Sequence, residues 1–309
     1  MQNINYSGQY YNNHNYNIKI RTGEDITNAT GDAICGEFMI ATGGANPGLY
    51  IATQTSGDDF EIYRVSEIST ANKIVPYTLL PSITDIYSLK FDGVDDYVTM
   101  SNPTSLNFAG SFTISLWVMY TNVSSSFNFL VDKSTDITTR QYSLYLRDQT
   151  TGTKTFSFYG VDSGGNQQFL NSTGSIAVNT WNHVAVVCNS GVTDGTKLYI
   201  NGVAETLGTF TVASNASAPF QLGKRSDNSY LHQGLMDEVA VFDSALAASD
   251  IASIYNNGTP ADISTLNPVG WWRMGDDNAG VGTIITDQGS GGNDGTLTNG
   301  PIFLTHVPS

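Results

Sequence analysis

Three acidic side chains stand within five residues around a glycine, and this spacing is the clearest chemical signal in the sequence. Asp92, Asp95 and Asp96 surround Gly93, which lets the backbone turn between two extended segments. Carboxylates this close together are unfavourable unless they face water or a cation. Hard oxygen ligands grouped around a turn suit Ca²⁺. A solvated acidic turn explains the same residues without a metal, so both interpretations stay open at this point.

The charge balance disfavours several classes of partner. The chain of 309 residues carries 13 Lys and Arg against 28 Asp and Glu, a formal net charge of −15. Binding nucleic acid through its phosphates needs clustered Lys and Arg, so we expect no nucleic acid partner. An anionic membrane surface is disfavoured for the same reason, and no apolar run is long enough to insert across a bilayer. Aromatic residues make up 11% of the chain, which distinguishes it from disordered acidic proteins.

The N-terminus and the cysteines give no sign of export. The first residues have neither the basic start nor the apolar core of a signal peptide, so we expect no secretory route. Cys35 and Cys188 lie far apart in different segments, which argues against a disulfide framework. These features predict a protein that is made in a reducing cytoplasm.

Residues 1–22 are rich in Asn and Tyr and lack aliphatic periodicity over most of their length. Such a segment is mobile when it stands alone. We expect it to form an extended N-terminal arm that becomes ordered on a partner chain. A short edge strand on the protein's own next module explains the composition equally well.

Residues 23–84 are predicted to form a small β-module and a linker. Three short strands separated by turns are expected at 36–42, 48–53 and 60–65. Three such strands bury too little apolar surface to be stable alone, so the module must pack on a neighbour. Residues 67–84 contain Pro76 and Pro81 and are predicted to be the linker.

Residues 85–309 have the pattern of a β-sandwich. Strands are expected at 112–118, 142–147, 155–159, 181–188 and 196–200. Asn201-Gly202 is a strong signal for a two-residue hairpin. A short helix is expected at about 248–256, with Gly258 just beyond its C-terminus.

Five phrases occur in order between residues 85 and 258: FDGVDDYV, SFTISLWV, NTWNHVAVV, KLYINGV and GLMDEVAVFDSAL. Together they resemble the laminin-G-like branch of the concanavalin A-like lectin/glucanase superfamily. The resemblance implies an all-β fold, a jelly-roll sandwich of two antiparallel sheets. It also implies that the FDG turn and the Asp-Glu pair of the late strand lie close together around Ca²⁺. The metal ligands expected on this basis are Asp92, Asp95, Asp237 and Glu238.

The C-terminal segment, residues 268–304, resembles a phrase that laminin-G-like proteins usually carry before the FDG strand. Circular permutation is physically easy where the ends of a compact domain lie close together. We therefore expect this segment to complete the sandwich as strands. Trp271 and Trp272 should then lie on opposite faces of a sheet, with Leu297 near Phe91. A separate tail that binds elsewhere is the alternative.

No pattern of catalytic residues is found in the sequence. The laminarinase side of the superfamily uses E-x-D-x-x-E, which places an acid/base and a nucleophile on one face of a strand. Glu238 and Asp243 have the wrong spacing for this motif, and no acid lies between Glu61 and Glu67. Neither a metal-ligand spacing nor a nucleophile motif surrounds the histidines, which are His14, His183, His232 and His306. His183 is predicted to be a hydrogen-bonded core residue. We therefore expect no enzyme.

Sugar binding would need exposed aromatic rings beside convergent polar groups. The aromatic candidates are Trp117, Tyr145, Tyr159 and Tyr230, although core packing explains most of them equally well. No sugar site is assigned from the sequence.

The features together predict a non-enzymatic virion structural protein of a bacteriophage. The N-terminal module resembles short β-modules of phage tail-fibre and virion proteins. A virus particle also reconciles synthesis in a host cytoplasm with a lectin-like domain, which usually acts outside cells. We expect a homotrimer in the capsid decoration, a head fibre or a tail fibre. Its arm would bind other virion proteins, and the domain would face a host-surface glycan. A secreted or surface carbohydrate-binding module is the alternative, and a glycoside hydrolase is the least favoured class.

Overall fold

The fold comes from a computed structural model, which describes residues 18–21, 38–41, 48–56, 59–68, 74–77, 80–81, 83–101, 103–121, 126–136, 140–150, 153–212 and 218–309. The chain divides into two compact units. The first comprises 1–80 with 248–253, and the second comprises 81–247 with 254–309. Among the described residues, no helix is both long and apolar enough to cross a membrane.

The first unit holds a five-stranded sheet in the order β1-β2-β3-β4-β5. Its strands are β1 (Ile18–Arg21), β2 (Phe38–Ala41), β3 (Gly48–Ser56), β4 (Asp59–Ile68) and β5 (Ile74–Tyr77). The three predicted strands are present as β2, β3 and β4, which pair antiparallel. The structure adds β5 inside the predicted linker, where Pro76 is tolerated because β5 is an edge strand. Most of the predicted arm, with its proposed partner contact, lies outside the described residues; its described part is β1, which pairs with β2.

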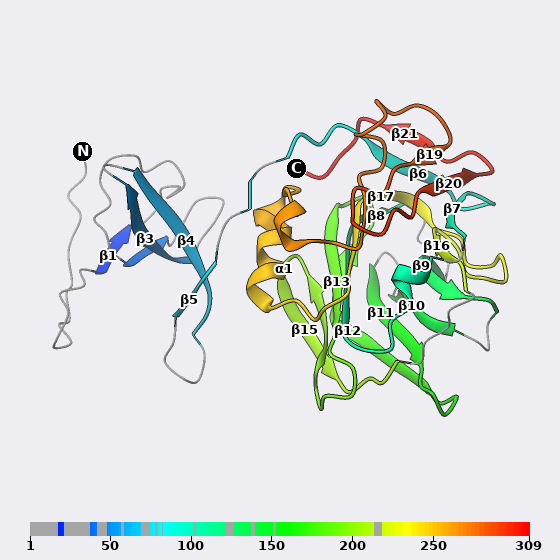
Figure 1. Cartoon of the computed structure of the whole chain (residues 1–309), viewed down its shortest axis with the longest axis horizontal. Helices are drawn as coiled ribbons and strands as arrows, with labels where there is room; N and C mark the ends of the chain where they lie inside the picture. Colours follow the sequence, from blue (N-terminus) through cyan, green and yellow to red (C-terminus); the bar gives the residue numbers. More distant parts are fainter. Residues whose placement is uncertain are drawn as a thin grey trace. The chain divides into compact units, whose positions relative to one another are not determined.

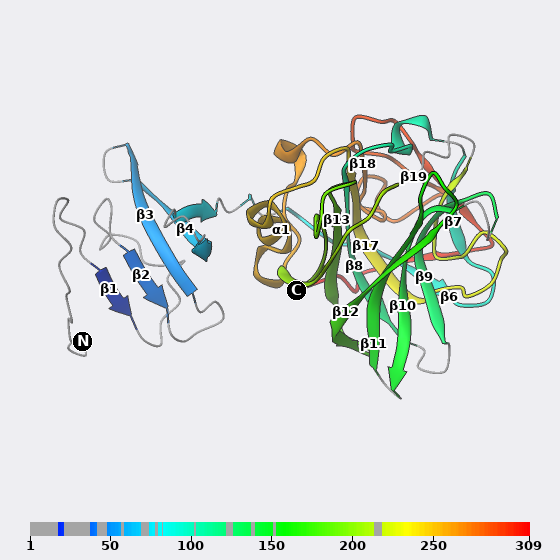
Figure 2. The same ribbon diagram turned by 90° about the horizontal axis from the view of Figure 1, so that it is seen from below.

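The second unit is a sandwich of two sheets, which Figures 1 and 2 show from two sides. The front sheet consists, in spatial order, of β12 (Gln167–Ala177), β11 (Thr153–Val161), β10 (Arg140–Thr150), β9 (Phe127–Ser134), β16 (Phe220–Leu222), β7 (Tyr97–Met100), β20 (Gly295–Thr298) and β19 (Ile284–Ile285). The back sheet consists of β15 (Val203–Gly208), β14 (Thr196–Ile200), β13 (Asn182–Cys188), β8 (Phe112–Tyr120), β17 (Gln233–Phe242), β6 (Ser88–Asp92) and β21 (Ile302–Leu304), with β18 (Gly270–Trp272) paired to β17. The predicted all-β sandwich of antiparallel sheets is confirmed.

The core lies between the two sheets because side chains alternate along each strand. On β10, Tyr142, Leu144 and Leu146 point into the core, whereas Ser143 and Tyr145 point to the outer face of the front sheet. Inward side chains from both sheets form one continuous buried cluster. Each strand therefore also presents a second, outward set of residues, and these are the ones available for function.

The C-terminal segment completes both sheets, as predicted. Its strands β18, β20 and β21 pair with β17, β7 and β6 respectively. Trp272 is fully buried in the core, whereas the Trp271 side chain lies outside the core cluster and donates a hydrogen bond to a buried carboxylate. The predicted placement of the pair on opposite faces is confirmed. Leu297 packs against the core cluster that contains Phe91.

Two local predictions are also confirmed. Asn201 and Gly202, with φ of 51° and 76°, form the two-residue turn between β14 and β15. A Cβ on Gly202 would lie 2.9 Å from a ring carbon of Tyr255, so only glycine fits this close approach. The helix α1 (Ala248–Tyr255) ends where expected and is followed by the short helix η3 (Asn256–Gly258). Two further short helices are η2 (Thr104–Leu106) and η4 (Ser264–Leu266).

Candidate functional site

The predicted calcium turn connects β6 to β7 and is held by its own backbone. Asp92 Oδ1 accepts hydrogen bonds from the N–H groups of Val94 at 2.7 Å and Asp95 at 3.3 Å. Asp96 Oδ2 accepts from the N–H of Asp92 at 2.9 Å. The bond from Val94 lowers the pKa of the exposed Asp92, whereas burial raises the pKa of Asp96. Oxygens of the three acids lie within 4.8 Å of one another, but backbone donors already serve two of these side chains.

A second acidic cluster lies beside β17 in the back sheet. Carboxylate oxygens of Asp85, Glu238 and Asp276 lie within 4.8 Å of one another, and the fully buried Asp237 precedes Glu238 in the chain. Arg273 bridges two members of this buried cluster. Its Nε donates to Glu238 Oε1 at 2.9 Å, and its Nη2 donates to Asp276 Oδ2 at 2.6 Å. The guanidinium of Arg273 therefore interacts with three carboxyl groups, those of Glu238, Asp276 and Asp85.

Three oxygens of the buried cluster have no donor. Within the described part of the chain, no hydrogen-bond partner reaches either carboxylate oxygen of Asp85 or the Oδ2 of Asp237. Burial, followed by the nearby charges of Glu238 and Asp276, raises the pKa of Asp85 to about 8. Burial raises the pKa of Glu238 to about 7 although Arg273 opposes the shift, and burial with the charge of Asp85 raises that of Asp237. A buried carboxyl group without donors needs a proton or a cation.

The structure divides the four predicted calcium ligands between these two places. Asp92 pairs with Gln233 across β6 and β17, so Asp237 lies four residues further along β17, about 13 Å away. Asp92 and Asp95 belong to the turn, whereas Asp237 and Glu238 belong to the buried cluster. The buried cluster suits a hard divalent cation better, because three of its oxygens are buried without a donor. Calcium binding stays a prediction at both places.

Aromatic side chains gather on the outer face of the front sheet. A cluster is formed there by Phe127, Phe129, Tyr145, Tyr159 and Val161. The guanidinium of Arg140 lies 4.8 Å from the ring centroid of Tyr159 and 5.4 Å from that of Phe129. Arg225 lies 4.4 Å from the ring centroid of Tyr230. The rings at the centre of this face are therefore covered by arginine side chains, and a ligand would have to bind elsewhere on the face.

Most of the aromatic side chains considered as sugar platforms are buried. Trp117 is 3% exposed on the back sheet, and Tyr145 and Tyr159 are buried on the front sheet. Tyr230 keeps 37% of its surface exposed. Phe169, which was not among the sequence candidates, is 55% exposed on β12, and its ring centroid lies 4.9 Å from that of Tyr159.

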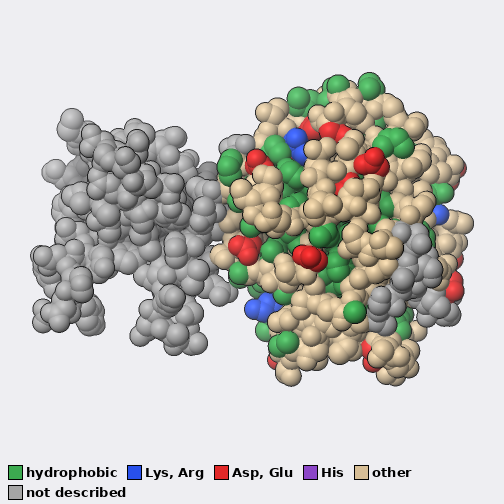
Figure 3. All heavy atoms as spheres, in the orientation of Figure 1, with side chains coloured by type: hydrophobic (Ala, Val, Ile, Leu, Met, Phe, Trp, Pro, Cys, Tyr) green, Lys and Arg blue, Asp and Glu red, His purple; other side chains and the backbone are tan. Residues whose placement is uncertain are grey.

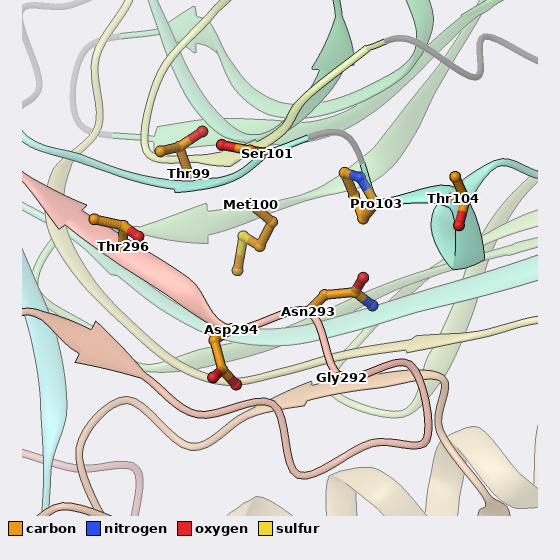
Figure 4. Close-up of a pocket in the computed structure, with 9 residues that line it drawn as sticks. All are labelled: Thr99, Met100, Ser101, Pro103, Thr104, Gly292, Asn293, Asp294 and Thr296. Atoms are coloured by element: carbon orange, nitrogen blue, oxygen red, sulfur yellow. The ribbon is translucent and has the colours of Figure 1, made fainter.

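An open polar pocket lies toward the other end of the front sheet (Figure 4). Two segments far apart in the chain form it: residues 99–101 and 103–104, at the end of β7 and just beyond it, and residues 292–294 and 296, before and within β20. The pairing of Thr99 with Thr296 brings them together. The pocket has a volume of about 370 Å³, and Met100 and other apolar atoms form a minor part of its lining. The polar lining residues are Thr99, Ser101, Thr104, Asn293, Asp294 and Thr296.

A hydrogen-bond network behind the pocket fixes its C-terminal wall. Asp287 accepts hydrogen bonds from the N–H groups of Trp271 and Gly289 through Oδ1, and from that of Asn293 through Oδ2, each at 2.8 Å. Asn293 Nδ2 donates to Ser105 Oγ at 2.8 Å, which ties the two segments together. The wall is therefore preorganised, and a ligand need not order it on binding.

The polar groups that line the pocket are largely uncommitted. Within the described residues, no hydrogen bond is made by the side-chain hydroxyls of Thr99, Ser101, Thr104 and Thr296. Asp294 accepts from the N–H of Asp287 through Oδ1 at 2.9 Å, which leaves its exposed Oδ2 free. Several free oxygens around one open pocket can hydrogen-bond to a small polar molecule. Sequence reasoning missed this pocket, because its residues are common turn residues that only the fold brings together.

A family model described as the concanavalin A-like lectin/glucanases superfamily matches residues 92–252, which is more than half of the chain. The chain belongs to this superfamily. The resemblance seen in the sequence is thus confirmed for the domain. No curated protein matches the chain.

Solved structures resemble the fold of this chain to different degrees. A candidate carbohydrate-binding protein from Bacteroides ovatus is 16% identical with a TM-score of 0.56, over 89% of this chain and 71% of that one. Domain 4 of an extracellular arabinanase from Geobacillus stearothermophilus, in complex with arabinotriose, is 21% identical with a TM-score of 0.43, over 60% and 91%. A heptameric pentraxin from Limulus polyphemus is 14% identical with a TM-score of 0.46, over 56% and 84%. At 16% identity, the likeness to the Bacteroides ovatus protein shows the fold alone.

Two histidines of this superfamily domain are core residues. His183 Nε2 lies 2.7 Å from Ser115 Oγ, and full burial lowers its pKa to about 3. This confirms the prediction of a hydrogen-bonded core residue. Burial likewise lowers the pKa of His232 to about 3. Neither belongs to the acidic groups found among the described residues, and His14 lies outside them.

Proposed function

We propose that this superfamily domain is a carbohydrate-binding, lectin-like module whose sugar lies in the polar pocket between β7 and β20. The observation that carries the proposal is the set of uncommitted oxygens around a preorganised, open pocket. Sugar recognition relies on several hydrogen bonds to neighbouring hydroxyls, and this lining can provide them. The description of the Bacteroides ovatus protein agrees with this proposal.

Binding in the pocket is recognition without turnover. The free Oδ2 of Asp294 accepts charge-assisted hydrogen bonds from sugar hydroxyls, while the Thr and Ser hydroxyls donate and accept. Among the described lining residues Asp294 is the single carboxylate, whereas glycoside hydrolysis uses a pair. This supports a binding protein rather than an enzyme.

The surface of the sandwich suits a neutral ligand. On the face shown in Figure 3, acidic side chains are scattered among uncharged ones, and basic side chains are few. Only 13% of all residues are charged, so hydroxyl and amide groups carry most of the surface polarity. A lectin that binds through hydroxyl contacts has this kind of surface.

Glycan binding by the intact chain tests the proposal. A screen of neutral oligosaccharides, followed by calorimetry with the tightest one, should reveal binding that Thr296→Val weakens about tenfold. The matched control is Thr298→Val, which changes the same residue type on the same strand but outside the pocket. Equal affinities of the two variants, or no glycan bound at all, would contradict the proposal.

We also propose that the domain binds Ca²⁺ at the buried cluster of Asp85, Asp237, Glu238 and Asp276. Calcium takes six to eight oxygen ligands, and the donor-free oxygens of Asp85 and Asp237 suit this chemistry. The ion would balance buried negative charge and tie β17 to the segment before β6, away from the sugar. This position revises the ligand set expected from the sequence, because Asp92 and Asp95 lie in the separate turn.

A thermal melt with and without chelator tests the calcium proposal. Calcium should raise the melting temperature of the wild-type chain, and Asp237→Asn should remove that response. Asp95→Asn serves as the control for the turn and should keep the response. If Asp95→Asn alone abolished the effect, the ion would belong to the turn instead.

The biological setting is a separate proposal. We propose a bacteriophage virion protein of the capsid decoration, a head fibre or a tail fibre, made in the host cytoplasm and assembled as a homotrimer. Other virion proteins would hold residues 1–22, and the sandwich would face a host-surface glycan. The sequence composition and the resemblance of the N-terminal module support this setting. Mass spectrometry of purified particles should detect the chain, whereas its presence only in the culture medium of its producer would favour a secreted module.

A further inference from the structure

The side chains that line the pocket between β7 and β20 offer more hydrogen-bond acceptors than donors (Figure 4). The side-chain Nδ2 of Asn293 donates to Ser105 Oγ at 2.8 Å and to Asp287 Oδ2 at 3.3 Å. The free polar atom of this side chain is therefore its amide oxygen, Oδ1. The free Oδ2 of Asp294 only accepts while it is ionised. Side-chain donors are thus limited to hydroxyl groups, which also accept. A well-matched ligand must bring several O–H or N–H donors of its own.

The pocket also carries negative charge without a local counter-charge. Among the described residues that line it there is no Lys, Arg or His, and Asp294 is exposed and ionisable. Lys224 lies on the same face of the front sheet, but its ammonium is engaged. It donates to Asn228 Oδ1 at 2.6 Å and lies 3.7 Å from the ring centroid of Tyr97. Tyr97 pairs with Thr298, a position outside the pocket.

We infer that the pocket selects neutral or cationic sugars with several free hydroxyls and excludes acidic sugars such as uronates, sialic acids and sulfated residues. The inference rests on the proposed carbohydrate binding and names the ligand class of that same site. An anionic group on the ligand would meet the Asp294 carboxylate in a pocket that offers it no cation, and like charges brought together disfavour binding. Asp294 is therefore the residue that determines specificity.

Matched pairs of monosaccharides test this selection on the full chain. Galactose and galacturonate differ only in the carboxylate at C6, as do glucose and glucuronate, while glucosamine adds an ammonium group. NMR titrations should show the backbone amides of Thr99 and Thr296 shifting with at least one neutral sugar. The acidic member of that pair should bind about tenfold more weakly or worse, the size expected for one lost interaction with a charged group. Glucosamine should bind at least as tightly as glucose.

The variant Asp294→Asn removes the negative charge of this side chain and keeps its size, so it tests whether charge causes the selection. The Asn side chain keeps an oxygen that can accept from the N–H of Asp287, so the wall is preserved. In this variant the preference for the neutral over the acidic sugar should shrink by about fivefold or more. The control is Asp194→Asn, an exposed acid on the turn between β13 and β14, which should leave the preference unchanged.

The outcomes separate the inference from the proposed function. If uronates bind as tightly as their neutral partners, or if Asp294→Asn leaves the preference intact, the selection is wrong and carbohydrate binding still stands. If no sugar shifts the pocket amides, the pocket is not the site and the proposed function fails there as well. Shifts confined to the surroundings of Phe169 and Tyr230 would place the sugar on the aromatic face and overturn the inference.

Discussion

The buried cluster beside β17 and the pocket between β7 and β20 both hold acidic side chains with uncommitted oxygens. They differ in whether water reaches those oxygens. In the buried cluster, Asp237 is fully buried and its Oδ2 has no donor. In the pocket, Asp294 is exposed and its Oδ2 faces solvent. Water stabilises the second oxygen at no cost to the fold, whereas the first must be neutralised by a proton or a cation. Burial therefore makes the cluster a determinant of stability and leaves the pocket free to bind a ligand.

The largest expected effect comes from removing the arginine of the buried cluster. Arg273→Met would leave Glu238 and Asp276 without their ion-pair partner, and we expect the free energy of unfolding to fall by about 3–5 kcal/mol. Arg147→Met is the control, because Arg147 is exposed and should change stability by less than about 0.5 kcal/mol. Chemical denaturation measures both. Similar stabilities of the two variants would show that the cluster is not a structural determinant.

The buried cluster should also make stability depend on pH and on calcium. The pKa of Asp85 is raised from 3.8 to about 8 and that of Glu238 from 4.5 to about 7, so the folded chain keeps protons that the unfolded chain releases above about pH 4. In chelator, the free energy of unfolding should therefore fall steadily as the pH rises from about 4 to about 8. Calcium should replace the protons and flatten this profile.

Asp237→Asn sharpens this test, because a neutral side chain of the same shape needs neither proton nor cation. Its profile in chelator should be flatter than that of the wild-type chain. Denaturation at a series of fixed pH values gives both profiles. A wild-type stability in chelator that stays constant or rises across this range would refute the assignment of raised pKa values to the cluster.

The smallest expected effect concerns the exposed aromatic side chain on β12. Phe169→Ala removes a ring that is 55% exposed, and we expect glycan affinity to stay within about twofold and stability within about 1 kcal/mol. Calorimetry with the glycan used for Thr296→Val provides the comparison. If Phe169→Ala greatly weakened glycan binding and Thr296→Val did not, the sugar would bind on the aromatic face and not in the pocket.

Much of the fold could be predicted from the sequence, because local signals agree with it. Alternating strands, the Asn201-Gly202 turn and the Trp pair of β18 each depend on residues adjacent in the chain. The candidate sites depend on register instead. Pairing Asp92 with Gln233 places Asp237 too far along β17 to share a metal with the turn. The residues around Asp237 do not by themselves indicate this register between β6 and β17.

The pocket and the buried cluster could not be found in the sequence for the same reason. Thr99 and Thr296 meet only because the C-terminal segment inserts β20 beside β7. Asp85 and Asp276 lie outside the strands, and the back sheet brings them to Glu238. The sequence left burial or exposure of Tyr159 open, and the structure shows it buried, with the guanidinium of Arg140 over its ring.

A crystal structure of the intact chain with its tightest neutral glycan tests the central claim most directly. We predict a sugar residue between β7 and β20, with hydroxyl groups about 2.7–3.0 Å from Asp294 Oδ2 and the hydroxyl of Thr296. A sugar stacked on Phe169 or Tyr230, with only water in the pocket, would contradict the account.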